Sequence, residues 1–102
     1  DRGPNPSRLL AAAVGGCLSA SLMFSARKLR LPITGLRSEV SVEIARNEAG
    51  RWRIGKMDVE LVPGIDQPDP GKWKRCLEMF EDFCVVTQSV RKGIDVSVKV
   101  RS

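Results

Sequence analysis

The sequence has no histidine, and only three of its 102 residues are cysteine. The absence of histidine excludes a Ser-His-Asp triad, a Cys-His pair and any zinc site with a histidine ligand. An odd number of cysteines in a chain without a secretory framework is typical of reduced cytosolic thiols rather than of structural disulfides. We therefore expect a cytoplasmic protein whose chemistry centres on cysteine.

Aromatic residues are also scarce, at 5% of the chain, although the formal net charge of +5 would suit an anionic partner. The basic residues occur in short separate groups, such as Arg91-Lys92, that alternate with carboxylates. Neither aromatic stacking positions nor a known nucleic-acid-binding motif is present. We expect a solvated surface and no nucleic-acid partner, and the alternative of a basic nucleic-acid-binding module rests on net charge alone.

A run without charged residues extends from Leu9 to Ala26. Its length matches the shortest membrane-spanning helices, roughly 18 residues. Its glycines, serines and alanines make it only weakly apolar, which favours a helix buried inside protein and packed closely against its neighbours. The apolar stretch before Cys17 is too short for the core of a lipoprotein signal. We therefore expect no membrane partner and no secretion.

The length of the chain fits a single domain over residues 1–102, without internal repeats. No segment is biased enough in composition to be disordered. A domain of this size buries only a modest core by itself, so partner subunits are expected.

The first half of the chain predicts a helix followed by a hairpin. Asn5 is placed as the N-cap and Pro6 at the first helical position, and the helix is expected to run to about residue 29, before Pro32. Residues 36–46 alternate between apolar and polar types, which predicts a half-buried strand, and residues 47–50 form a turn. In the second strand the apolar residues change parity at Gly55-Lys56, which predicts a β-bulge.

The second half predicts further helical segments and a last strand. Residues 63–71 hold three prolines and two glycines and are expected to be a loop. Apolar residues then recur at helical spacing from Trp73 to Cys84, a short irregular or helical passage covers residues 85–92, and residues 94–101 alternate as a strand. This order predicts an α+β domain with a three-stranded antiparallel-type sheet that buries the long first helix.

The three cysteines differ in what their positions predict. Cys76 lies on the apolar face of the second helix, where a cysteine usually acts as a small hydrophobic residue. On one continuous helix Cys76 and Cys84 would lie about 12 Å apart, too far for a disulfide unless the helix ends before Cys84. Any internal disulfide is therefore expected to involve Cys17. The preceding pair Gly15-Gly16 allows a backbone or a substrate to approach closely.

Two segments resemble a known family. Residues 5–18, Asn-Pro-Ser-Arg-Leu-Leu-Ala-Ala-Ala-Val-Gly-Gly-Cys-Leu, resemble the Asn-Pro-Glu opening and the alanine-rich, cysteine-bearing central helix of the OsmC/Ohr proteins. Residues 80–87, Phe-Glu-Asp-Phe-Cys-Val-Val-Thr, are similar to the second-cysteine segment of that family, commonly Cys-Pro-x-Ser or Thr. The strands agree in order and approximate spacing, so the resemblance covers nearly the whole chain.

The resemblance implies a fold, an activity and a site. The fold is an intertwined homodimer with the long helices at its centre and each active site at the subunit interface. The activity is reduction of organic hydroperoxides, in which Cys17 is the peroxidatic cysteine and Cys84 resolves its sulfenic acid as a disulfide. A dithiol reductant, such as a lipoyl protein, or a small thiol reopens that disulfide, and no metal or organic cofactor is required. Trp73, Phe80 and Phe83 would receive an alkyl chain or simply belong to the core.

Two departures from the family pattern support an alternative function. Ser7 replaces the family's glutamate, and the arginine that this glutamate orients belongs to an N-terminal sheet segment that we expect to be missing from this chain. Without a guanidinium near its thiol, a buried Cys17 would form its thiolate less readily and react slowly. Arg8 or Arg2 would have to substitute for the family's arginine. The alternative is a catalytically degenerate OsmC-like protein that binds a hydrophobic ligand or a protein partner.

Overall fold

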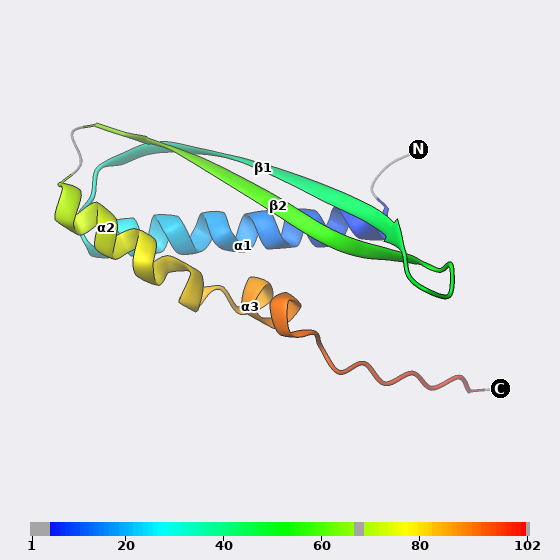
Figure 1. Cartoon of the computed structure of the whole chain (residues 1–102). Coiled ribbons are helices and arrows are strands. Elements are labelled where there is room, and N and C mark those ends of the chain that lie inside the picture. Colours follow the sequence, from blue (N-terminus) through cyan, green and yellow to red (C-terminus); the bar gives the residue numbers. More distant parts are fainter. Residues whose placement is uncertain (1–4, 67–68, 102) are drawn as a thin grey trace.

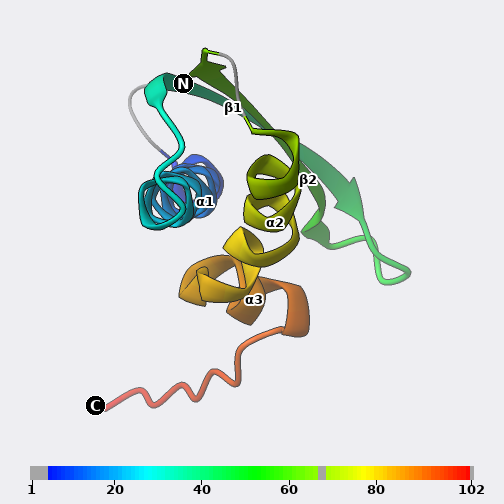
Figure 2. The same cartoon turned by 90° about the vertical axis from the view of Figure 1, so that its left-hand side faces the viewer.

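The computed structural model of the chain describes residues 5–66 and 69–101. It has an α+β fold in which the long helix α1 lies along the β1-β2 hairpin, with the shorter helices packed beside α1 (Figures 1 and 2). The elements in chain order are α1 (Pro6–Lys28), β1 (Ile33–Arg46), β2 (Trp52–Ile65), α2 (Pro70–Met79), the 3₁₀ helix η1 (Phe80–Phe83) and α3 (Val85–Lys92).

Helix α1 begins and ends as its sequence predicts. The Asn5 side chain accepts a hydrogen bond of 2.9 Å from the Arg8 backbone N–H, and Pro6 occupies the first helical position. Arg27 and Lys28 lie in the last turn, where positive charge complements the helix dipole.

The core is built around α1. By length and composition α1 is apolar enough to cross a membrane, with a mean hydropathy of 1.8 over 18 residues. Its buried residues contact the hairpin and the other helices. The buried cluster consists of Val14, Leu18, Leu22, Ala26, Leu31, Cys76, Phe80 and Cys84.

The hairpin confirms the predicted turn and bulge. Asn47 Oδ1 accepts hydrogen bonds from the backbone N–H groups at residues 49 and 51, and Gly50 has the positive φ of +78° that favours glycine. Glu43 pairs with Lys56 and Ile44 pairs with Ile54, so Gly55 is the extra residue of the bulge.

The predicted loop over residues 63–71 is wrong at both ends, because β2 continues to Ile65 and α2 begins at Pro70. Pro63 lies within the strand opposite Leu36. In this two-stranded sheet each strand has a free edge, where the missing N–H of a proline costs no ladder hydrogen bond. Residues 67 and 68 of the predicted loop lie outside the described part of the chain.

The predicted continuous helix from Trp73 to Cys84 is also wrong. Helix α2 ends at Met79, η1 follows, and Cys84 has extended backbone angles of φ −87° and ψ 97° before α3 begins. The helical spacing of apolar residues persists across this break because α2, η1 and α3 all pack against α1. The spacing alone therefore could not reveal where the helix stops.

The predicted strand over residues 94–101 is not formed within the single chain. Residues 93–101 lead away from α3 without regular structure (Figure 1), and their apolar side chains are 63–89% exposed. A strand needs a neighbour for its backbone hydrogen bonds, and in the described residues β1 and β2 pair only with each other. The sheet therefore has two strands rather than three.

Candidate active site

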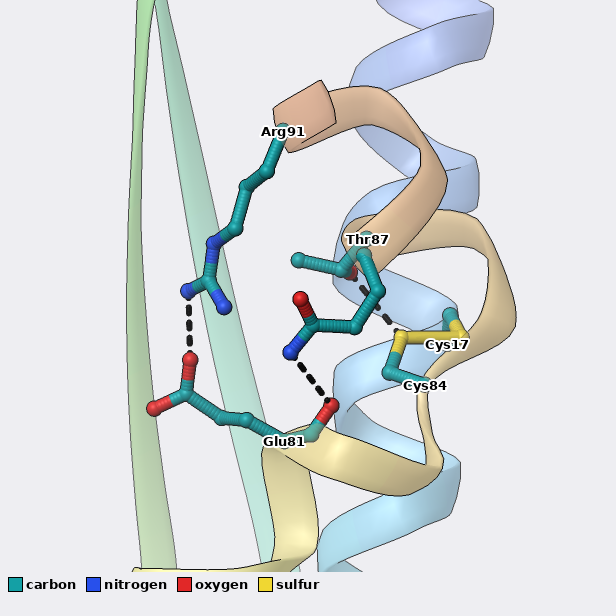
Figure 3. Close-up of a disulfide and its surroundings, with 6 residues drawn as sticks. Cys17, Glu81, Cys84, Thr87 and Arg91 are labelled. Atoms are coloured by element: carbon teal, nitrogen blue, oxygen red, sulfur yellow. Dashed lines mark hydrogen bonds and ion pairs between the residues drawn. A yellow bond between two sulfur atoms is a disulfide. The ribbon is translucent and has the colours of Figure 1, made fainter. Parts of the chain in front are cut away.

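A disulfide joins the middle of α1 to the start of α3. Cys17 and Cys84, 67 residues apart in the sequence, are bonded through their sulfur atoms, with a distance of 5.8 Å between their Cα atoms (Figure 3). A disulfide between Cys76 and Cys84 was expected only if the helix ended before Cys84. The helix does end there, after Met79, but Cys84 bonds to Cys17 and Cys76 is free. The expectation that an internal disulfide involves Cys17 is confirmed, whereas the expectation of reduced thiols applies only to Cys76.

Gly15 brings the sheet close to α1 beside this disulfide. A Cβ atom at Gly15 would lie 2.6 Å from Val40 Cγ2 on β1, closer than real side chains allow, whereas one at Gly16 would meet nothing within 4 Å. The close approach expected from the glycine pair is therefore made by β1, at the first glycine only. Cys17, two residues further along α1, is partly exposed.

The segment around Cys84 is held from both sides. Gln88 on α3 donates a side-chain hydrogen bond of 3.1 Å to the Glu81 carbonyl, and the Arg91 guanidinium forms an ion pair with the Glu81 carboxylate (Figure 3). Both contacts connect α3 to η1, across the turn that contains Cys84. The turn fixes Cys84 as the N-cap residue of α3, where it is fully buried and bonded to Cys17.

Thr87 is a site residue for which the sequence analysis predicted no role. It is only 5% exposed, and its Oγ1 lies 2.9 Å from Cys84 Sγ. A disulfide sulfur carries no hydrogen, so the Thr87 hydroxyl is the donor and the sulfur the acceptor. The available signal was the Cys-x-x-Thr spacing, which places the hydroxyl in the first turn of a helix that begins after the cysteine.

Cys76 is separate from this chemistry. It is a free cysteine on α2, fully buried within the apolar cluster, and desolvation by burial raises the pKa of its thiol. A buried thiol with a raised pKa supplies little thiolate at neutral pH, so its predicted core role is confirmed.

A cleft of about 680 Å³ lies between α1, β2 and α3. Its apolar lining includes Val14, Leu18, Val59, Leu61, Phe80 and Val90, and its polar lining includes Thr87 and the Glu81–Arg91 pair. Of the three aromatic residues proposed for an alkyl-binding site, Phe80 lines the cleft, Trp73 packs against the core and Phe83 packs edge-to-face on Phe24, with ring centroids 6.2 Å apart. Thr87 is thus shared by the cleft and the disulfide.

Of the two proposed substitutes for the family arginine, Arg8 and Arg2, only Arg8 lies within the described residues. Arg8 lies in the first turns of α1, about 13 Å along the helix axis from Cys17, because each helical residue advances about 1.5 Å. Arg2 lies outside the described residues.

Comparisons with known proteins support the resemblance found in the sequence. The family model described as OsmC-like protein matches residues 1–99. No curated protein matches the chain.

Solved structures with the same fold were also found. They include an OsmC-like hydroperoxide resistance protein from a Jannaschia species (TM-score 0.77, 18% identity, covering 100% of this chain and 71% of that one). The organic hydroperoxide resistance protein OhrB of Bacillus subtilis gives a TM-score of 0.65 at 24% identity, covering 99% of this chain and 73% of that one. An OsmC-like protein of unknown function from Vibrio cholerae gives 0.64 at 17%, covering 82% of this chain and 56% of that one. The chain thus spans between about half and three quarters of the length of these proteins.

Proposed function

The chain belongs to the OsmC-like protein family, and on this premise we propose that it is a thiol peroxidase that reduces organic hydroperoxides. The observation that carries the proposal is the pairing of a partly exposed Cys17 with a buried Cys84. A peroxide needs access to the attacking thiol but not to the resolving one. The names of two structural neighbours, both hydroperoxide resistance proteins, agree with this activity.

The proposed reaction uses two electrons and both thiols. The Cys17 thiolate attacks the terminal oxygen of the hydroperoxide, the O–O bond breaks, and the alkoxide leaves and takes up a proton to become an alcohol. Cys17 keeps the terminal oxygen as a sulfenic acid. The Cys84 thiolate then attacks the Cys17 sulfur, the S–S bond forms as the S–O bond breaks, and the hydroxide leaves and takes up a proton to become water. A dithiol or small thiol of the cytoplasm returns the two electrons, and no metal or organic cofactor takes part.

The first test is the oxidation of the reduced protein by a brief exposure to one equivalent of an alkyl hydroperoxide. We expect rapid and stoichiometric formation of the Cys17–Cys84 disulfide, because the two Cα atoms already lie within the range for a disulfide. Mass spectrometry of the alkylated and digested protein identifies the linked peptides. Cys76 should remain a free thiol, since it is fully buried.

The outcome of this oxidation separates the two candidate functions. Slow oxidation, or oxidation spread over all three cysteines, would contradict the peroxidase proposal. That result would favour the alternative of a degenerate family member that binds a hydrophobic ligand. The observation behind this alternative is the cleft of about 680 Å³, whose apolar walls suit an alkyl chain.

The proposal includes a homodimer in which residues 93–101 pair with the sheet of a second copy. Ile94, Val96, Val98 and Val100 share one face of an extended segment and are 63–89% exposed, an arrangement that a second subunit would bury. The double substitution Val96→Lys and Val98→Lys should weaken the dimer at least tenfold, because charge would enter the buried face. Ser97→Lys, on the opposite face, should leave the dimer intact.

Sedimentation velocity over a range of protein concentrations measures both variants. A wild-type protein that remains monomeric at all concentrations would refute the homodimer, as would a Ser97→Lys variant that dissociates as readily as the double variant.

A further inference from the structure

We propose that Thr87 positions the disulfide for its reduction, so that an incoming thiol attacks Cys17 and Cys84 departs as the leaving thiolate. The inference deepens the proposed peroxidase function and rests on it, since it concerns the step that returns the enzyme to its reduced state. It assigns a role to a buried hydroxyl that the oxidation steps do not use.

The two sulfur atoms of the disulfide differ in their access to solvent. Thiol–disulfide exchange requires the attacking sulfur to reach one of the two disulfide sulfurs. Cys84 is fully buried, whereas Cys17 is partly exposed. In the single chain an external thiolate can therefore approach Cys17 and not Cys84.

The two sulfur atoms also differ in how well each is stabilised as a leaving thiolate. Exchange is faster when the departing sulfur is the better stabilised thiolate. The Thr87 hydroxyl already donates to Cys84 Sγ at 2.9 Å, and a bond of this kind strengthens when its acceptor becomes an anion. Cys84 is also the N-cap of α3, whose first turn has no side-chain cap, so the positive end of the helix dipole acts on the same sulfur.

Reduction of the disulfide by a dithiol takes two exchange steps. One thiolate of a dithiol attacks Cys17 Sγ, a new S–S bond forms there, and the Cys17–Cys84 bond breaks with its electron pair left on Cys84 Sγ, where Thr87 donates to it. The second thiolate of the dithiol then attacks the first sulfur of the same dithiol, which is bonded to Cys17 in the mixed disulfide, and Cys17 leaves as a thiolate. The dithiol ends as a cyclic disulfide, the protein has gained two electrons, and both protein thiolates are available for protonation by water.

The test compares two substitutions of similar size. Thr87→Val keeps the shape of the side chain and removes the donor, whereas Thr87→Ser keeps the donor. Ser89→Ala, which removes a hydroxyl from the same short helix, is the matched control. Each protein is oxidised with diamide and reduced with excess dithiothreitol, and the loss of the disulfide is followed by rapid alkylation and mass spectrometry.

We expect Thr87→Val to be reduced about tenfold more slowly than wild type, in line with the loss of one hydrogen bond to a charged sulfur. Thr87→Ser and Ser89→Ala should stay within about twofold. With a single thiol, 2-mercaptoethanol, followed by alkylation with N-ethylmaleimide in denaturant, which exposes the buried thiols, the mixed disulfide should be found on Cys17 and the maleimide on Cys84 and Cys76. If the role of Thr87 were purely structural, Thr87→Ser would not restore the rate of reduction while the mixed disulfide still formed on Cys17.

The proposal is overturned if Thr87→Val is reduced as fast as wild type, if Thr87→Ser is as slow as Thr87→Val, or if the mixed disulfide forms on Cys84. Because diamide replaces the peroxide, this experiment does not depend on peroxidase activity. Failure of the proposed function is read separately, from the reaction of the reduced wild-type protein with alkyl hydroperoxide.

Discussion

Replacing Cys17 with serine is expected to lower hydroperoxide reduction on the order of a thousandfold or more, because a hydroxyl is a far weaker nucleophile than a thiolate at neutral pH. The structure supports this expectation through the partial exposure of Cys17 and its bond to Cys84. The measurement is steady-state consumption of an alkyl hydroperoxide with a dithiol as the electron donor.

The other two cysteines supply matched controls for this loss. Cys84→Ser should still react with peroxide but lack the resolving thiol, so Cys17 should accumulate as sulfenic acid. A second molecule of hydroperoxide should oxidise it to sulfinic acid, and mass spectrometry detects both products as added oxygen. Cys76→Ala should keep its turnover, because the Cys76 thiol is buried away from the disulfide. If Cys17→Ser retained activity, or if Cys76→Ala lost it while still folded, Cys17 would not be the peroxidatic residue.

The sequence predicted those parts of the fold that local signals determine. The Asn5 cap, the turn at Gly50 and the bulge at Gly55 each depend on the chemistry of a few adjacent residues, and all three occur in the structure. The pairing of residues 94–101 depends instead on a neighbouring strand, which periodicity cannot supply. The end of α2 could not be predicted from the spacing of apolar residues, because α2 and the segments after it all pack against α1.

The site was only partly accessible from the sequence. Cys17 and Cys84 were selected by resemblance to a family, and their proximity could not be deduced from positions 67 residues apart. Thr87 was visible only as the last residue of a similar segment. Its contact with Cys84 depends on a helix that starts just after the cysteine, and that start follows from the break between η1 and α3.

The contact between Gly15 and β1 gives the second large expected effect, on stability. Gly15→Ala should lower the free energy of unfolding by about 2 kcal/mol, since the added methyl group overpacks a site already filled by Val40 Cγ2 at 2.6 Å. The loss should outweigh the gain of up to about 1 kcal/mol that alanine brings to a helix interior. In a chain of this size the corresponding fall in Tm is about 10 °C, measured at one fixed protein concentration.

Shortening Val40 should reverse this loss. In a Val40→Ala background the obstructing methyl group is absent, so adding Gly15→Ala should be neutral or stabilising, and the two substitutions should show a coupling energy of about 2 kcal/mol in a double-mutant cycle. Gly16→Ala makes the same change one residue further along α1, where a Cβ meets nothing within 4 Å, and should not destabilise the chain. Equal losses at both glycines, or additivity of Gly15→Ala with Val40→Ala, would show that the close approach of β1 is not what requires glycine beside Cys17.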